Sequence, residues 1–196
     1  DLSIGKNNIN HQRVILDKIN VIPARNFITS KNIKVFKNIL FSESKIEKLI
    51  ILNDLGILAK IIPEFSNIVF QTQFDHYHSL TVDQHTLKAL SILKSIKNNK
   101  TKKKYYEFPR KVFNNSFDKK PLFYATLLHD IGKGLDGDHH LKGANLARKI
   151  ILRFKENKII ANETSWLVKH HLLMSEYAFK KDLEDSSVIK RLSSKI

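Results

Sequence analysis

The chain of 196 residues is long enough for one domain with a substantial core, and its hydrophobic content of 42% excludes wholesale disorder. No apolar run reaches the ~20 residues of a bilayer-spanning helix, and the opening DLSIGKNNIN lacks the pattern of a signal peptide. Cysteine is absent, which excludes disulfides and thiolate metal sites, and we expect a cytoplasmic location.

The formal net charge of +15 is typical of nucleic-acid binding, but here it has a simpler interpretation. Lys, Asn and Ile are abundant along the whole chain, which indicates a general compositional drift. We therefore interpret the charge mainly as a solvated basic surface. A phosphate-bearing substrate or anionic partner is the second interpretation, and nucleic acid is the least favoured.

In the first third of the chain, residues 1–30 show weak periodicity and many Asn, so they form a lead-in. A helical pattern begins at Ile33, where apolar residues recur three and four positions apart. Ser42 is positioned to cap a second helix, which Gly56 would end. Pro63 then interrupts the pattern.

The middle of the chain has two further helical segments. Thr81 followed by Gln84 is a capping-box pattern, ahead of a helix that runs to about Ile96. Residues 97–120 are a charged connector with the basic run KKK, and Pro121 suits the first turn of the next helix.

Three helical segments follow: residues 141–154, a helix that includes residues 166–171, and residues 188–192. Strand patterns are limited to short pieces such as NIVF. The predicted fold class is all-α.

The stretch TLLHDIGKGLDGDHH ends an apolar helix on His129 and Asp130. A buried ionised Asp is costly unless a cation meets it. Adjacent helical residues point about 100° apart, so these two side chains do not satisfy each other but can both reach one ion beyond the helix end. An N,O ligand pair without sulfur suits Mn²⁺, Mg²⁺, Fe²⁺ or Zn²⁺.

Further histidines and carboxylates occur around this pair in the sequence. A single histidine is more often structural, but the joint pattern is typical of a mononuclear or dinuclear metal site. The other members of the group are His76, His78, His85, Asp136, Asp138, His139, His140, His170 and His171.

Lys133 follows Asp130 by three residues, in a glycine-flanked turn. It could hold a phosphate oxygen together with free backbone N–H groups, or it could simply complement the dipole at a helix C-terminus. The residues leave both interpretations open.

These residues resemble the HD-domain family of metal-dependent phosphohydrolases, since His85 followed by His129-Asp130 begins the H…HD…D signature. Over about residues 35–192 the chain is similar to the HD domain of the bifunctional uridylyltransferase/uridylyl-removing (GlnD) family of bacterial nitrogen signalling. The segments that carry this resemblance are ILNDLGILAKIIPEF, QFDHYHSLTVDQHTL, LLHDIGKGLDGDHHLKGA and WLVKHHLLMSEYAFKKDLED.

The resemblance implies a domain organisation. Residues 35–196 would form an HD-domain helical bundle, truncated at its C-terminal end, and residues 1–34 a linker from an upstream nucleotidyltransferase domain outside this chain. The family's last Asp ligand would lie beyond residue 196. Asp182 and Asp185 are expected to be caps or surface charges instead.

The resemblance also implies roles for site residues. The metal ligands would be His85, His129 and Asp130, holding Mn²⁺ or Mg²⁺, with Fe²⁺ or Zn²⁺ also compatible. The catalytic side chains, which would contact or protonate the phosphoester, would be Lys133, His139 and His171. His139 is preferred to His140 because the family usually has a small polar residue at the position of His140.

The implied activity is removal of UMP from a tyrosine of the PII signalling protein by phosphodiester hydrolysis. Glutamine would act through ACT domains that lie outside this chain. Two alternatives stay open: a general HD nucleotide phosphohydrolase, and a non-catalytic helical module whose basic connector, residues 97–111, docks an acidic partner or RNA. The intact metal-ligand set argues against the second alternative.

Overall fold

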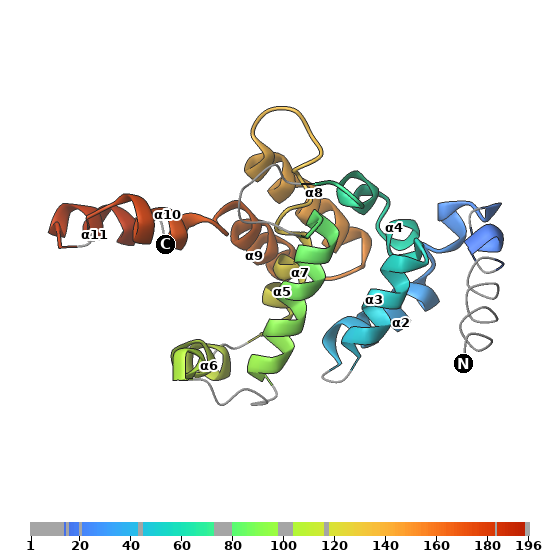
Figure 1. Ribbon diagram of the computed structural model, residues 1–196, viewed down its shortest axis with the longest axis horizontal. Coiled ribbons are helices and arrows are strands. Elements are labelled where there is room, and N and C mark those ends of the chain that lie inside the picture. Colours follow the sequence, from blue (N-terminus) through green and yellow to red (C-terminus); the bar gives the residue numbers. More distant parts are fainter. Residues whose placement is uncertain are drawn as a thin grey trace, which may run out of the picture.

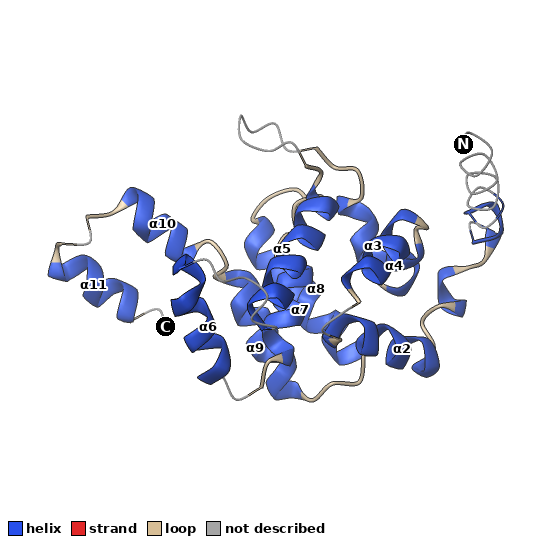
Figure 2. Ribbon diagram, turned by 60° about the horizontal axis from the view of Figure 1, so that its bottom comes forward, coloured by secondary structure: helices blue, strands red, loops and turns tan. Residues whose placement is uncertain are grey.

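The computed structural model describes residues 14, 16–19, 21–42, 45–72, 80–97, 104–115, 118–182 and 184–194. This part of the chain is helical and contains no strand, which confirms the all-α prediction (Figures 1 and 2). Among the described residues, no helix combines the length and apolar character needed to cross a membrane.

The α-helices are α2 (Ser30–Phe41), α3 (Ile46–Asp54), α4 (Ile57–Ile61), α5 (Val82–Lys97), α6 (Glu107–Asn115), α7 (Lys120–Leu128), α8 (His139–Arg153), α9 (Lys158–Lys169), α10 (Leu173–Lys180) and α11 (Ser186–Ser193). Short 3-10 helices are η1 (Ala24–Asn26), η2 (Pro63–Ile68) and η3 (Lys104–Tyr106). The predicted helices therefore exist, with boundaries shifted by a few residues. The segment NIVF is not a strand, since its first residues end η2.

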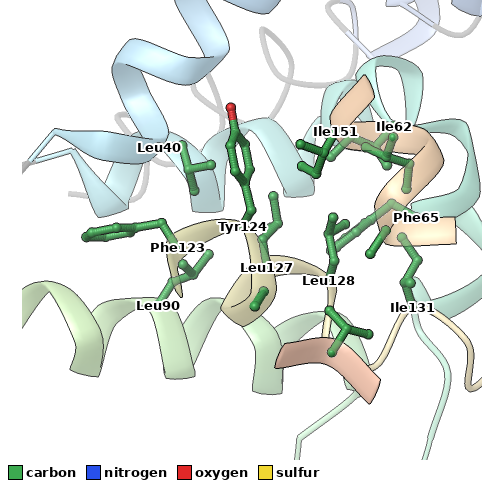
Figure 3. Close-up of a cluster of buried hydrophobic side chains, with 14 of the residues drawn as sticks. Leu40, Ile62, Phe65, Leu90, Phe123, Tyr124, Leu127, Leu128, Ile131 and Ile151 are labelled. Carbon is green, nitrogen blue, oxygen red and sulfur yellow. The ribbon is translucent and has the colours of Figure 1, made fainter. Parts of the chain in front are cut away.

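Helix α7 is the centre of the fold because it is apolar on nearly every side, as a buried helix must be. It contacts α2, α5, α8 and α9. The most extensive contact between two helices is that of α8 with α9. Figure 3 shows Leu127 and Leu128 of α7 among core side chains such as Leu90 and Ile151. Because α7 ends at Leu128, the His-Asp motif begins where this buried helix stops.

Helices α2, α3 and α4 lie to one side of this centre (Figure 1). The buried Lys94 of α5 joins α2 to it by donating to the carbonyl oxygens of Leu40 at 2.7 Å, Ile39 at 3.3 Å and Ser42. The prediction that Ser42 caps the following helix is wrong. Ser42 ends α2, where unpaired carbonyls need a donor, and α3 starts after Lys45.

The connector predicted at residues 97–120 is also more ordered than expected, because it contains η3 and α6. Phe113 is buried and packs edge-on against Phe123 of α7, with ring centroids 6.4 Å apart. Pro109 lies within the first turn of α6, where a missing N–H is tolerated. The first two lysines of the basic KKK run lie outside the described residues.

Helices α10 and α11 form a hairpin that extends from the main body (Figures 1 and 2). Leu173, Tyr177 and Val188 form its own small core. Asp185 caps α11 by accepting from the backbone N–H of Ser187 at 2.8 Å, so the predicted capping role is confirmed.

Candidate metal centre

Two helices, α5 and α7, bring the predicted metal ligands to one place. His85 lies in the second turn of α5, and His129 and Asp130 follow the last residue of α7. A ligand atom from each of the three lies within 4.8 Å of those from the other two. The ring centroids of His85 and His129 are 5.4 Å apart. The structure thus brings His85 to the His129-Asp130 pair, which is distant from it in the sequence.

His171 joins this cluster from the turn after α9. Its ring centroid lies 5.2 Å from that of His129, and its Nε2 lies 3.5 Å from Oδ1 of Asp130. The helix expected to include residues 170 and 171 ends earlier, at Lys169. This early end leaves His171 half-buried in a turn that faces the end of α7.

The histidine tautomers are set by main-chain carbonyl groups. Nδ1 of His129 lies 2.9 Å from the carbonyl oxygen of Thr126, and Nδ1 of His171 lies 2.7 Å from that of Val168. A carbonyl oxygen only accepts, so each Nδ1 carries a proton and donates it. In the neutral ring, Nε2 then offers its lone pair toward Asp130, which is the arrangement seen in metal-ligating histidines.

Asp130 is 3% exposed, so its ionised carboxylate needs positive charge or hydrogen-bond donors in place of water. Its Oδ2 lies 3.1 Å from Nε2 of His129, and its buried Oδ1 has no hydrogen-bond partner. Burial alone would raise the pKa of Asp130. The two neighbouring imidazoles, when they carry a proton on Nε2, and the Lys133 ammonium group outweigh burial and hold that pKa well below its usual range.

A divalent cation fits this donor set. Neutral imidazole Nε2 atoms and an ionised carboxylate meet with their lone pairs facing one another, which is repulsive unless protons or a metal ion lie between them. The unpartnered Oδ1 of Asp130 supplies a further free lone pair. The residues present therefore suit a metal ion with nitrogen and oxygen ligands.

Lys133 lies beside this donor set, with Nζ 2.9 Å from Oδ2 of Asp130. The turn that carries it is fixed by its own backbone, since Lys133 donates its N–H to the carbonyl oxygen of Asp130 at 2.9 Å. Gln71 donates from Nε2 to the carbonyl oxygen of Lys133 at 3.1 Å. The side chain is thus a cation at the edge of the site rather than a solvated surface charge.

His139 and His140 begin α8, and their rings lie 3.9 Å apart between centroids. It is the His140 ring that neighbours His171, at 5.1 Å. Burial lowers the pKa of His140, and the nearby rings of His139 and His171 lower it further. The sequence prediction preferred His139 to His140, and only the contact of His140 with His171 indicates that His140 borders the site. The catalytic assignment of His139 stays a prediction.

The remaining acidic residues of the predicted group have other positions. Asp138 caps α8 by accepting from the backbone N–H groups of His140 and Leu141, each at 3.0 Å. Asp136 is exposed, and its carbonyl oxygen accepts from Lys142. His76 and His78 lie outside the described residues.

Asp83 is a site-positioning residue that the sequence did not single out. It is buried in the first turn of α5 and accepts from Nδ2 of Asn53 at 2.8 Å and from the backbone N–H of Phe70 at 3.3 Å. These bonds tie the start of α5 to α3, two residues before His85. The capping-box glutamine contributes as well, since Oε1 of Gln84 accepts from the N–H of Thr81 at 3.3 Å.

A cavity of about 580 Å³ opens beside the cluster. Its polar end includes His85, His129, Asp130, Lys133 and His171. Its other lining residues are mostly aliphatic and come from α5, α7 and the α9 region. A phosphoryl group at the polar end would therefore have space for a substituent beside it.

The family follows from comparison with known proteins. A family model described as HD domain matches residues 82–193, which include the candidate metal ligands and the candidate catalytic residues. The chain belongs to the HD domain family.

Three of its relatives carry the same name, bifunctional uridylyltransferase/uridylyl-removing enzyme. The protein of that name from Zymomonas mobilis is 43% identical over 143 residues, which are 71% of this chain and 15% of the relative. The one from Novosphingobium aromaticivorans is 40% identical over 138 residues, 70% of this chain and 15% of the relative. The one from Phenylobacterium zucineum is 38% identical over 159 residues, 80% of this chain and 17% of the relative.

This chain thus spans about one sixth of the length of the curated relatives that it matches. A search of solved structures gave no match to the chain.

Proposed function

We propose that this HD domain removes UMP from uridylylated PII signalling protein by hydrolysing the phosphodiester bond to a tyrosine. The name of the relatives includes a uridylyl-removing activity, and the HD domain match covers the site. The remaining domains of such a protein, including ACT domains that respond to glutamine, would lie outside this chain.

One observation carries the proposal: a buried, ionised Asp130 with an unpartnered oxygen, facing Nε2 atoms of two histidines. Lys133 pairs with Oδ2 of Asp130, so without a further cation the Oδ1 atom and the Nε2 lone pairs of the neutral histidines have no compensation. We propose Mn²⁺ or Mg²⁺, with Fe²⁺ or Zn²⁺ as compatible replacements. His85, His129 and Asp130 would hold the ion, which supplies Lewis-acid chemistry and activates water.

The other side chains act on the phosphodiester itself. Lys133, at the cavity edge, binds a phosphoryl oxygen and offsets the charge that develops there. Water oxygen bonds to phosphorus as the bond from phosphorus to the tyrosine oxygen breaks, so the departing phenolate needs a proton. His139, or His171 in its form protonated on Nε2, supplies that proton.

The first experiment measures Mn²⁺ and Mg²⁺ binding by calorimetry, and release of UMP from uridylylated PII, for the parent chain and Asp130→Ala. Asp54→Ala, an exposed carboxylate change at the end of α3, is the matched control. We expect Asp130→Ala to lose both metal binding and UMP release, whereas Asp54→Ala retains both.

A second measurement separates the proposal from a general nucleotide phosphohydrolase. Hydrolysis of free cyclic and linear nucleotides is compared with release of UMP from uridylylated PII, at equal metal concentration. Faster turnover of free nucleotides than of the modified protein would contradict the proposed substrate while leaving the metal chemistry intact.

A further inference from the structure

The cavity beside the metal centre has two chemically different ends. Away from Asp130 its walls are apolar, and the hydroxyl of Thr126 already donates to the carbonyl oxygen of Leu122 at 2.8 Å. The aliphatic lining residues of this end are Ala89, Leu122, Ala125 and Leu167. We call them the aliphatic arm of the cavity.

The substrate of the proposed function, on which this inference rests, also has two unlike ends. On one side of the phosphorus is the phenyl ring of tyrosine, which has no hydrogen-bonding group other than the ester oxygen. On the other side are ribose and uracil, whose polar atoms each need a partner when buried. An aliphatic pocket satisfies the ring but would leave the nucleoside unpaired.

The aliphatic arm leads to the protein surface. Its residues Leu122 and Leu167 also line an adjoining cavity of about 400 Å³ between α6, α7 and α9. Val112 and Trp166, 51% and 40% exposed, lie along this second cavity. A tyrosine within a polypeptide has main chain on both sides of it, so its ring needs an access route of this kind.

A polar cavity adjoins the site at His140 and Leu172. This third cavity, of about 390 Å³, shares the Leu172 side chain with the first one. Its polar lining residues are Asp138, His140, Lys169, His170 and Glu176. His140 borders the site directly, beside His171. Donors and acceptors suited to a ribose and a pyrimidine base are therefore on this side.

We propose that the phosphodiester lies with its tyrosyl ring in the aliphatic arm and its nucleoside toward the polar cavity. The polypeptide that carries the tyrosine follows the adjoining groove between α6, α7 and α9. The charged lining residues of that groove are Asp118 and Glu163, so a basic residue near the modified tyrosine is favoured.

The test uses the two halves of the substrate as separate ligands: phenyl phosphate for the aryl side and UMP for the nucleoside side. Calorimetry measures binding of each to the Mn²⁺-loaded 196-residue chain. Two variants fill the aliphatic arm from different helices, Ala89→Phe on α5 and Ala125→Leu on α7. Ala178→Phe, on the exposed face of α10, is the matched control.

Filling the arm should weaken the affinity for phenyl phosphate by about tenfold or more. The affinity for UMP should change by less than about twofold. Retained UMP binding also shows that the variants are folded. Lys169→Ala should give the reverse pattern, and the control variant should change neither affinity.

Two results would overturn this orientation of the substrate. One is loss of UMP binding alone in Ala89→Phe and Ala125→Leu, and the other is an equal loss of binding of both ligands in both variants. Failure of both ligands to bind the Mn²⁺-loaded parent chain is a different result. It would overturn the proposed function, and the orientation together with it.

Discussion

Gly132 shows how closely the main chain packs around the metal centre. A Cβ atom at this position would lie 2.1 Å from the carbonyl oxygen of His139 and 2.9 Å from the backbone nitrogen of Gly143. Both neighbours are main-chain atoms of α8, which cannot rotate away as a side chain can. The absence of a side chain at Gly132 therefore lets the turn after Asp130 rest on the start of α8.

We expect Gly132→Ala to lower the free energy of unfolding by about 2–4 kcal/mol, because the clash must move a helix. Gly137→Ala, in the same turn, is the comparison: it has room for a Cβ but a φ of +86°. Its cost should be about 1–2 kcal/mol, from backbone strain alone. Urea unfolding of the two variants measures the difference, and equal costs would contradict the packing explanation.

Lys133 has a testable role distinct from that of the metal ligands. Its Nζ contacts Asp130 but lies at the edge of the cavity, so its removal takes away a cation without removing a ligand. Lys133→Ala should lower kcat for hydrolysis of the 4-nitrophenyl ester of UMP by about 100-fold.

Mn²⁺ affinity should stay the same or increase in Lys133→Ala. Lys142→Ala, which removes another lysine near the same turn, serves as the control and should retain activity. Loss of metal binding in Lys133→Ala would show that this residue supports the metal centre instead of the phosphoryl group.

Among the helices, the contact between α2 and α5 includes a buried ammonium group, that of Lys94. Lys94 donates to carbonyl groups at the end of α2, which have no intrahelical donor. Lys94→Met preserves the length of the side chain but leaves those buried carbonyls unpaired. We expect a loss of about 1–3 kcal/mol in the free energy of unfolding.

Lys88→Met is the matched change on the exposed face of α5 and should cost less than about 0.5 kcal/mol. Chemical denaturation of both variants checks this expectation. Similar stabilities for the two variants would mean that the end of α2 is satisfied without Lys94.

At the scale of the whole molecule, Glu156 connects the turn between α8 and α9 to two other helices. It accepts from Nζ of Lys37 on α2 at 2.6 Å and from the hydroxyl of Tyr124 on α7 at 2.9 Å. Burial opposes ionisation, but the hydrogen bonds and the positive charge of Lys37 prevail, and they hold the pKa of Glu156 below its usual value.

A lowered carboxyl pKa makes stability depend on pH in a defined direction. The unfolded chain takes up protons near the ordinary pKa of 4.5, before the folded chain does. The stabilisation by Glu156 is therefore complete above that pH and is lost as the pH falls through the lower, folded value. Glu156→Gln should be less stable than the parent at pH 7, by about 1–3 kcal/mol, with a smaller difference below pH 4.

Thermal unfolding between pH 7 and pH 3 measures this effect, with the exposed Glu184→Gln as a control. A stability difference that stays constant over this range would show that the charge of Glu156 does not contribute.

The sequence by itself determined the all-α class, the buried character of α7 and the place where the His-Asp motif ends it. Those features depend on local apolar periodicity and on residue types next to one another in the chain. The grouping of His85 with His129 and Asp130 could also be predicted from the sequence, because the order of these residues resembles the signature of a known family.

Only the tertiary structure decided which side chains meet across helices. The contact of His140 with His171, the attachment of α5 through Asp83 and the binding of α2 by Lys94 each join residues that are distant in the sequence. Periodicity shows which face of a helix is apolar, but it does not show which neighbour covers that face. The aliphatic arm of the cavity exists for the same reason, since its walls come from three segments whose packing no local pattern specifies.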